Sequence, residues 1–294
     1  MINFLVNSGI GDISWLFSKL DEFSKEKEIE FLIAKDENKR SKPFVEMHPR
    51  IKFKKYSLAD NCYVINNTIP FNTDLHSLEE NKIHILSMNK WLETKNHMKD
   101  WFPDQPTNYY YDLNFSECGI KRAEQLLKEG NDRPKIGIYG STYSTLRYWG
   151  FWDEKRWLIF IQKIREIYPD AIFYIIGAKF DIEMKDRLAD ILMYNNIDYV
   201  RVIGEDLDTA LYVIKNLDYF FSFPSGLGIV ANVLRTPCMM FMPGHLELMK
   251  YMFTEECDKK SGFFLNPLFI REHEAFRIWK DLGKKHCDAR LRNT

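Results

Sequence analysis

From residue 135 to residue 242 the sequence alternates short apolar runs with helical patterns, and the connections between them are short. The apolar runs predict strands at 135–139, 171–176, 199–203, 219–223 and 238–242. The patterns between them predict helices at 153–167, 180–194, 207–215 and 226–234. Such alternation is typical of a parallel sheet covered by helices on both faces. Right-handed crossovers bring the carboxyl ends of the strands to one edge of the sheet, where ligands bind.

The first part of the chain shows a weaker version of this pattern. A strand is predicted at 2–6 and a helix at 12–25, followed by short apolar runs at 29–34, 51–53, 63–65 and 83–86. Residues 87–116 have poor periodicity, which favours loops and short helices. A chain of 294 residues is long enough for two domains with separate cores. We predict domains at 1–130 and 131–294, with a last helix near 271–282 that packs back on the first domain.

Composition excludes several classes of protein. The formal net charge is −1, so no overall field attracts nucleic acid. The five cysteines contain no C-x-x-C pair, which indicates a reducing compartment. No stretch approaches the roughly 18 apolar residues that a membrane span needs, and the apolar run at the N-terminus is too short for a signal peptide. These features predict a cytoplasmic protein.

A turn with two glycines, residues 7–12 (NSGIGD), joins the first predicted strand to the first predicted helix. Glycines such as Gly9 and Gly11 allow a tight turn and a close approach of the backbone to a ligand, and the amides of a helix start favour negative charge. The dinucleotide pattern G-x-G-x-x-G is incomplete, because Ser14 occupies its third glycine position. Asp12 is either the N-cap of the helix or a carboxylate that faces a ligand, and the spacing leaves both interpretations open.

A loop rich in hydroxyl groups, residues 140–149 (GSTYSTLRYW), follows the predicted strand at 135–139. Glycine and small hydroxyl residues after a strand can surround phosphate oxygens, and arginine forms paired hydrogen bonds with a diphosphate. The alternative is an exposed turn with an ordinary surface arginine. The residues predicted to bind phosphate are Ser141, Ser144, Thr145 and Arg147.

A second glycine-containing turn opens the predicted helix at 226–234. It follows the strand at 219–223, so it also lies at the carboxyl edge of the sheet, where a helix start and glycines permit an anion to approach. The alternative is a tight turn that binds nothing. Two such loops in one domain make phosphate binding more plausible for both, and the second contributes Ser225, Gly226, Leu227 and Gly228.

Other motifs for chemistry are weak. Asp206 and Asp208 form a D-x-D pattern, but they stand where a helix begins, and an N-cap explains them better than a metal site. The histidines form no ligand spacing, so we predict no metal, and no G-x-S-x-G motif supports a hydrolase triad. The prediction is a binding cleft for a phosphorylated ligand.

These segments resemble the lipopolysaccharide heptosyltransferases, glycosyltransferase family 9. That family opens with a strand, a G-x-G-D-like turn and a helix, which residues 9–12 match. Its second domain begins with a strand, a Gly/Ser/Thr turn and a basic residue two positions before a tryptophan, which Arg147 and Trp149 match with Arg in place of the usual Lys. A strand that ends in Gly-Ala and is followed by an acidic residue near the donor ribose is matched by residues 177–181, and Asp181 is that acidic residue.

The last family motif is matched in part. The family has Asp-Ser/Thr-Gly-x-x-His before a helix of small residues and a Thr-Pro strand, and this chain has residues 224–229 followed by Thr236 and Pro237. Pro224 and Ile229 replace the family's Asp and His, which lie near the diphosphate and the sugar of the donor. The identity of the sugar therefore does not follow from the resemblance, which covers most of 133–245 and the first twenty residues.

The resemblance implies the GT-B fold, with two Rossmann-like domains whose parallel sheets face a central cleft. It implies an inverting, metal-independent transfer of a sugar from a nucleotide diphosphate-sugar to an acceptor hydroxyl, without a cofactor. Asp12 is the implied base on the acceptor-side domain, and the second domain binds the nucleotide-sugar, with Asp181 on the ribose. The acceptor is a glycan, a lipid-linked glycan or a modified DNA base, and the sugar is a hexose, heptose or pentose.

Three alternatives remain open on sequence alone. The first is another enzyme of the same fold, such as a nucleotide-sugar epimerase or hydrolase, although an epimerase needs further acid/base residues in the cleft. The second is a phage-type DNA glycosyltransferase, against which the near-neutral charge argues mildly. The third is a non-catalytic nucleotide-binding protein in which Asp12 is only a cap. The oligomeric state is left open.

Overall fold

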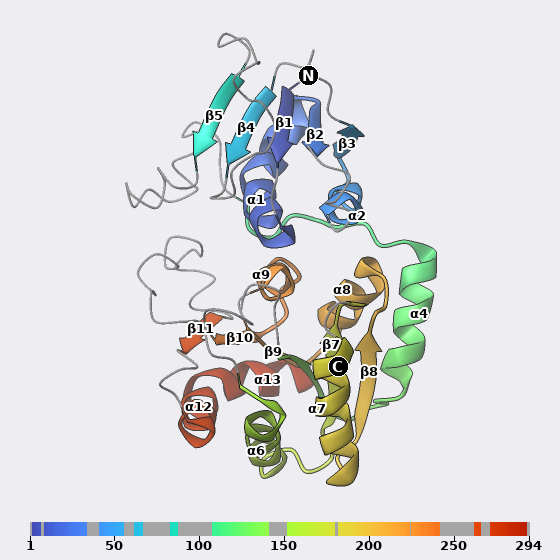
Figure 1. The fold of residues 1–294 in the computed structure, drawn as a ribbon, viewed down its shortest axis with the longest axis vertical. Helices are drawn as coiled ribbons and strands as arrows, with labels where there is room; N and C mark the ends of the chain where they lie inside the picture. Colours follow the sequence, from blue (N-terminus) through green and yellow to red (C-terminus); the bar gives the residue numbers. More distant parts are fainter. Residues whose placement is uncertain are drawn as a thin grey trace. The chain divides into compact units, whose positions relative to one another are not determined.

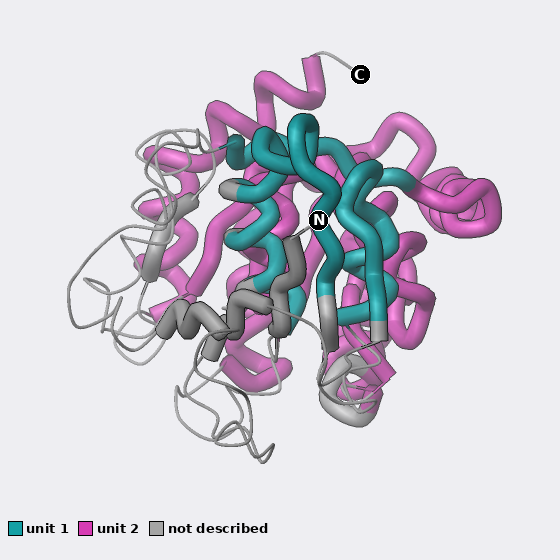
Figure 2. The backbone as a smooth tube through the Cα atoms, turned by 90° about the horizontal axis from the view of Figure 1, so that it is seen from above, with its two compact units in different colours: residues 1–114, 247–252 teal, residues 115–246, 253–294 magenta. Residues whose placement is uncertain are grey.

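The computed structural model of the chain describes residues 2–6, 9–33, 41–55, 62–66, 83–87, 108–140, 152–179, 182–223, 225–241, 262–265 and 271–292. These residues fall into two units (Figure 2). The described residues before 115 form unit 1, and those from 115 onward form unit 2. Each unit has a parallel sheet of its own.

The described strands of unit 1 form one parallel sheet. They are β1 (Ile2–Val6), β2 (Ile29–Ile33), β3 (Ile51–Lys55), β4 (Cys62–Asn66) and β5 (Ile83–Ser87). Their order is β3-β2-β1-β4-β5 (Figure 1), so strand addition reverses between β1 and β4. That reversal is the topological switch point of the sheet. Each strand predicted in this part of the chain is confirmed to within two residues.

Helix α1 (Ile10–Glu26) follows β1 and buries one face, because its apolar residues recur at three- and four-residue spacing. Ile13, Leu16, Phe17 and Leu20 are at most 1% exposed. The ring of Phe17 packs edge-on against Phe31 of β2, with centroids 5.1 Å apart. The short helix α2 (Ser41–Glu46) completes this core with Phe44 and Val45.

A buried ionic network joins α1 to the turn before β3. Asp21 accepts a hydrogen bond from Asn108 Nδ2 at 2.9 Å and pairs with the guanidinium of Arg50. His48 Nε2 lies 3.2 Å from Asp21 Oδ1. His48 Nδ1 accepts the backbone N–H groups of Arg50 and Ile51 at 3.2 and 3.1 Å, so Nε2 carries the proton of the neutral ring.

The two titratable groups of this network are shifted in the same direction. Burial lowers the pKa of His48 below its ordinary 6.5. Burial by itself would raise the pKa of Asp21, but the hydrogen bonds from His48 and Asn108 and the charge of Arg50 outweigh burial and lower it. The folded state therefore favours a neutral imidazole beside an ionised carboxylate.

The described strands of unit 2 form a second parallel sheet. They are β6 (Lys135–Tyr139), β7 (Ile172–Gly177), β8 (Tyr199–Ile203), β9 (Tyr219–Ser222), β10 (Cys238–Phe241) and β11 (Gly262–Leu265). Their order is β11-β10-β9-β6-β7-β8, with strand addition reversing between β6 and β9. This is the strand order of the Rossmann fold. The predicted strands are confirmed, and β11 is an addition that the sequence patterns did not indicate.

Two sets of helices accompany this sheet. Helix α6 (Glu154–Arg165) contacts α7 (Ile182–Tyr194) and α12 (Glu272–Ile278), whereas α8 (Leu207–Lys215) contacts α4 (Glu117–Lys128) and α9 (Gly226–Val233). Strand β7 is buried along its whole length, which explains its uninterrupted apolar sequence. The helices predicted between 153 and 234 are therefore confirmed.

The last helical segment packs within unit 2. It continues from α12 through a π-helical turn (Trp279–Gly283) into α13 (Lys284–Leu291). Trp279 is fully buried, and its ring lies 5.8 Å from Tyr219 and 5.7 Å from Phe221. The described contacts of this segment include β9, β10 and α6 of unit 2. Packing of this helix on the first domain stays a prediction.

The division between the units differs from the predicted boundary at 130/131. It falls between Asn114 and Phe115, because α4 packs on α8 and belongs to unit 2. The Phe115 ring lies 5.2 Å from Tyr212, and Ser116 donates a hydrogen bond to Asp208 at the start of α8. Because α4 packs on α8, the chain passes from unit 1 to unit 2 in the segment before α4.

Candidate functional site

The carboxyl ends of β6 and β9 lie side by side in the sheet of unit 2. Tyr139 pairs with Ser222, and the backbone N–H of Phe223 donates to Tyr139 O at 3.2 Å. This is the topological switch point, where doubly wound sheets bind their ligands. Both loops predicted to bind phosphate begin directly after these strands. The tertiary structure therefore brings the starts of the two loops together.

Helix α9 begins at this edge, and its first turn is ordered by Ser225. Ser225 is the N-cap, with extended backbone angles, and its side chain accepts the backbone N–H of Gly228 at 3.1 Å. The amides of Gly226 and Leu227 belong to the same turn, where helix geometry provides no backbone partner. These two amides and the positive end of the helix dipole form a place that suits an anion.

Gly228 is closely packed. A Cβ at this position would lie 2.5 Å from Ser222 Oγ and 2.7 Å from Met240 Cε, so a larger residue would require both side chains to shift. Ile229, where the resembled family has histidine, is 9% exposed within α9. Its side chain has no polar atom to offer a ligand.

Most of the other residues predicted in unit 2 fall in segments that the structure does not describe. Ser141, Ser144, Thr145 and Arg147 lie outside the described residues, as do Asp181 and Pro224. Gly140, directly after β6, is described and buried. Gly177 ends β7, the neighbour of β6, so the segment that contains Asp181 follows the next strand along the same edge.

In unit 1 the predicted turn also follows a strand at a switch point. Helix α1 begins at Ile10, and the N–H of Ile13 bonds to Gly9 O at 3.2 Å. Gly9 therefore precedes the helix, Gly11 is buried in its first turn, and Asp12 is its third residue. The helix was predicted to begin at Asp12, so the N-cap interpretation of this residue is wrong. The side chain of Asp12 lies outside the described part of the structure.

The D-x-D pattern has structural roles. Asp206 is the N-cap of α8, as predicted, although its side chain makes no capping hydrogen bond. The carboxylate of Asp208 accepts hydrogen bonds from Ser116 and, at 2.8 Å, from the N–H of Thr209. One oxygen of Asp208 thus joins the start of α4 to α8, and the other bonds within α8.

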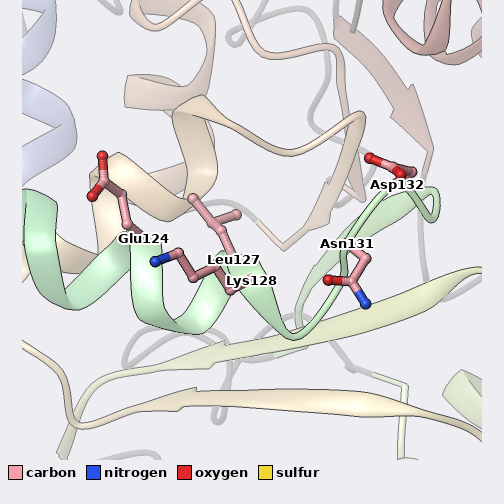
Figure 3. Close-up of a pocket in the computed structure, with 5 residues that line it drawn as sticks. All are labelled: Glu124, Leu127, Lys128, Asn131 and Asp132. Atoms are coloured by element: carbon pink, nitrogen blue, oxygen red, sulfur yellow. The ribbon is translucent and has the colours of Figure 1, made fainter.

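A surface hollow of about 500 Å³ lies elsewhere on unit 2 (Figure 3). It is lined by Glu124, Leu127, Lys128, Asn131 and Asp132. Asn131 and Asp132 directly precede β6, so the hollow is at the amino end of that strand. Ligands of doubly wound sheets bind at the opposite edge.

The described residues contain neither a cluster of metal ligands nor a helix suited to crossing a membrane. Within them, no three His, Cys, Asp or Glu side chains gather in a way that would hold a metal ion. None of the helices in the described segments combines the length and hydropathy that crossing a bilayer takes.

The sequence patterns missed a set of aromatic residues beneath the switch point. Trp152, Trp157, Phe223 and Phe241 are at most 1% exposed and pack on one another at the carboxyl ends of β9 and β10. The available signal was the pair of tryptophans that flanks the start of α6, which forms a hydrophobic staple across its N-cap.

Comparison with known proteins identifies the fold. No family model and no curated protein matches the sequence. Among solved structures, the E. coli ADP-heptose lipopolysaccharide heptosyltransferase II matches with a TM-score of 0.71 and 14% identity, over 97% of this chain and 99% of that one. A family 9 glycosyl transferase from Veillonella parvula matches with a TM-score of 0.65 and 12% identity, over 100% and 97%.

A third match has a different activity in its description. A putative UDP-N-acetylglucosamine 2-epimerase from Listeria monocytogenes matches with a TM-score of 0.55 and 11% identity, over 99% of this chain and 91% of that one. Identities this low establish a shared fold. The chain has the GT-B fold of the heptosyltransferases, as its sequence predicted.

Proposed function

We propose that this protein is a glycosyltransferase that moves a sugar from a nucleotide diphosphate-sugar to an acceptor hydroxyl, with inversion and without a metal ion. The observation that carries the proposal is the pairing of Tyr139 with Ser222, which sets the starts of two phosphate-type loops next to each other. A diphosphate has two anionic groups, and two adjacent loops can bind both. The fold neighbours named as heptosyltransferases support a sugar donor of this kind.

Each predicted residue has a role in the proposed reaction. Asp12 takes the proton of the acceptor hydroxyl as that oxygen attacks the anomeric carbon. Arg147, the hydroxyls of Ser141, Ser144 and Thr145, and the start of α9 stabilise the negative charge that develops on the departing diphosphate. Asp181 binds the ribose of the nucleotide.

The proposal does not extend to heptose as the sugar. The resembled family has histidine where this chain has Ile229, which is buried and carries no hydrogen-bonding group. Without that group, the hydroxyl pattern of the sugar is recognised by other residues or differs from that of heptose. Hexosyl, heptosyl and pentosyl donors therefore belong in the same test.

The competing function with support of its own is a nucleotide-sugar epimerase, because one fold neighbour is described as such. An epimerase changes the donor sugar in the absence of an acceptor, whereas a transferase consumes donor only when an acceptor is present. Incubation of the protein with a bound nucleotide-sugar alone, followed by analysis of the sugar, separates the two functions. Conversion to an epimer without any acceptor would replace our proposal.

The first test is a thermal-shift panel of nucleoside diphosphates and nucleotide-sugars. A ligand at a hundred times its dissociation constant stabilises the folded state by about 2.7 kcal/mol, which is readily detected. We expect one base to stand out, and we expect its binding to persist in EDTA. Loss of binding in EDTA that Mg²⁺ or Mn²⁺ restores would contradict a metal-independent reaction. No shift with any member of the panel would contradict the proposal as a whole.

A further inference from the structure

Trp157 contacts residues at the ends of several strands beneath the candidate site. Its ring centroid lies 5.9 Å from Phe223, which follows β9, and 5.4 Å from Phe241, the last residue of β10. Its indole also faces Gly140, which follows β6: a Cβ on Gly140 would lie 2.8 Å from Trp157 Nε1 and 3.3 Å from Cε2. One buried side chain therefore supports the carboxyl ends of three neighbouring strands.

The same ring also contacts the residue at the far end of the first loop. Residues 141–151 run from Gly140 to Trp152, and the Trp152 and Trp157 centroids are 5.2 Å apart at an angle of 67°. The residues on either side of this segment, Gly140 and Trp152, therefore both pack against Trp157. Phe223 is the flank of the second loop, since it precedes Pro224 and the cap of α9.

Local chemistry at the start of α6 fixes the position of Trp157. Asp153 is the N-cap and accepts the N–H of Arg156 at 2.9 Å, while Trp152 before the cap packs on Trp157 in the first turn. The Arg156 guanidinium lies 5.1 Å above the Trp152 ring and pairs with Glu272 at the start of α12. Trp157 is therefore held in place by contacts within its own helix, α6, and by the pairing of that helix with α12.

We propose that Trp157 is a positioning residue that holds Gly140 and Phe223, where the two proposed diphosphate-binding loops begin, in register with each other. The inference rests on the proposed function, because the loops matter only if they bind a diphosphate. Interiors are packed as densely as crystals, so a change in this ring displaces Gly140 and Phe223 together. Hydrogen-bonding groups of the protein that bind two phosphates at once lose affinity for them when the spacing between these groups changes by a fraction of an ångström.

Trp279 provides a matched control in the same domain. It is as buried as Trp157, but its ring contacts Tyr219 and Phe221 within β9 and not the residue that follows that strand. Trp157→Phe and Trp279→Phe remove the same atoms from one core, and we expect both to lower the melting temperature. A role in stability alone predicts equal effects on the loops, whereas a positioning role predicts that only Trp157→Phe affects them.

The experiment measures both variants in the full chain. We expect Trp157→Phe to weaken binding of the nucleoside diphosphate that the wild type prefers by roughly tenfold or more, and Trp279→Phe to leave it unchanged. We also expect faster amide hydrogen exchange in peptides that cover 140–151 and 223–228, in the Trp157 variant alone. Equal effects of the two variants on affinity and on exchange would overturn the inference.

The exchange measurement needs no nucleotide, so the two proposals fail separately. A wild type that binds no nucleoside diphosphate refutes the proposed function, and exchange still decides whether Trp157 holds these segments. If Trp157→Phe does not fold, Gly140→Ala replaces it, with Gly137→Ala as the control. The added methyl group at 140 would meet Trp157, whereas at 137 it would meet Leu217 and Phe220 inside the sheet. Faster exchange at 140–151 and 223–228 in both alanine variants alike would overturn the inference.

Discussion

Asp12 is the third residue of α1, where its charge is favourable to the helix dipole whether or not it takes part in a reaction. The start of the helix at Ile10 removes the N-cap interpretation but leaves this contribution to helix stability. What remains is a carboxylate in the first helical turn after a glycine-containing loop at the switch point of unit 1. The catalytic role of Asp12 stays a prediction.

We expect Asp12→Asn to lower the transfer rate by about 10²–10⁴-fold, the usual contribution of general base catalysis, and to leave affinity for the nucleoside diphosphate nearly unchanged. Asparagine has the size of aspartate but cannot accept the proton. Glu22→Gln, which neutralises another carboxylate of α1, is the control and should keep the wild-type rate. Wild-type transfer by Asp12→Asn on the natural acceptor would remove Asp12 from the mechanism.

Helix α9 offers a test at the scale of the element. Ser225 and Ser116 are both N-caps, and each accepts the N–H three residues ahead, at 3.1 and 3.0 Å. Replacement of either by alanine should cost about 1 kcal/mol of stability. We expect only Ser225→Ala to weaken binding of a nucleoside diphosphate, by about 2- to 10-fold, which corresponds to the loss of one hydrogen bond.

Titration calorimetry on the two serine variants provides the comparison. Equal affinities in Ser225→Ala and Ser116→Ala would mean that the start of α9 does not touch the nucleotide. The serine pair is well matched in capping geometry, so a difference in affinity reports location and not helix stability. Ser116 also donates a hydrogen bond to Asp208, so Ser116→Ala removes more interactions than Ser225→Ala does. A loss of affinity that appears only in Ser225→Ala therefore cannot be attributed to greater damage to the fold.

At the scale of elements, strongly periodic segments were predicted well. Strand β6 and helix α8 have the predicted bounds, because their patterns are regular and turn residues flank them. Helix α4 was not predicted, although Ser116 caps it and Ala123 and Leu126 form its buried face. Most of the surface of α4 is polar, and its few apolar residues can be recognised as a buried face only once the packing on α8 is known.

At the scale of the whole unit, the buried network of Asp21 and His48 makes the stability of unit 1 depend on pH. The unfolded chain protonates His48 near its ordinary pKa of 6.5, whereas the folded ring, with its pKa lowered by burial, stays neutral there. Unfolding therefore takes up a proton, and the free energy of unfolding falls as the pH drops below 6.5. Asp21, whose pKa is also lowered, adds a loss of the same sign below its ordinary value of 3.8.

Urea denaturation between pH 7 and pH 5 checks this expectation. The wild type should lose stability over this range, and His48→Gln should be less stable at pH 7 but show a shallower dependence on pH. His286, which is also shifted to a lower pKa by burial, is present in both proteins and cancels in the comparison. Parallel pH profiles for the two proteins would assign the dependence to other groups.

The sequence by itself determined the alternation of strands and helices and the parallel sheets, because periodicity and turn residues are local properties of the chain. The GT-B fold was implied by the resemblance of its motifs to a known family. The sequence also located the turns at Gly9 and Gly226 directly after strands. Tertiary structure alone decided that Tyr139 and Ser222 are neighbours, that α4 belongs to unit 2 and that Trp157 contacts residues that flank both loops. These contacts join residues far apart in the chain, and they follow from strand order and long-range burial, which no local pattern encodes.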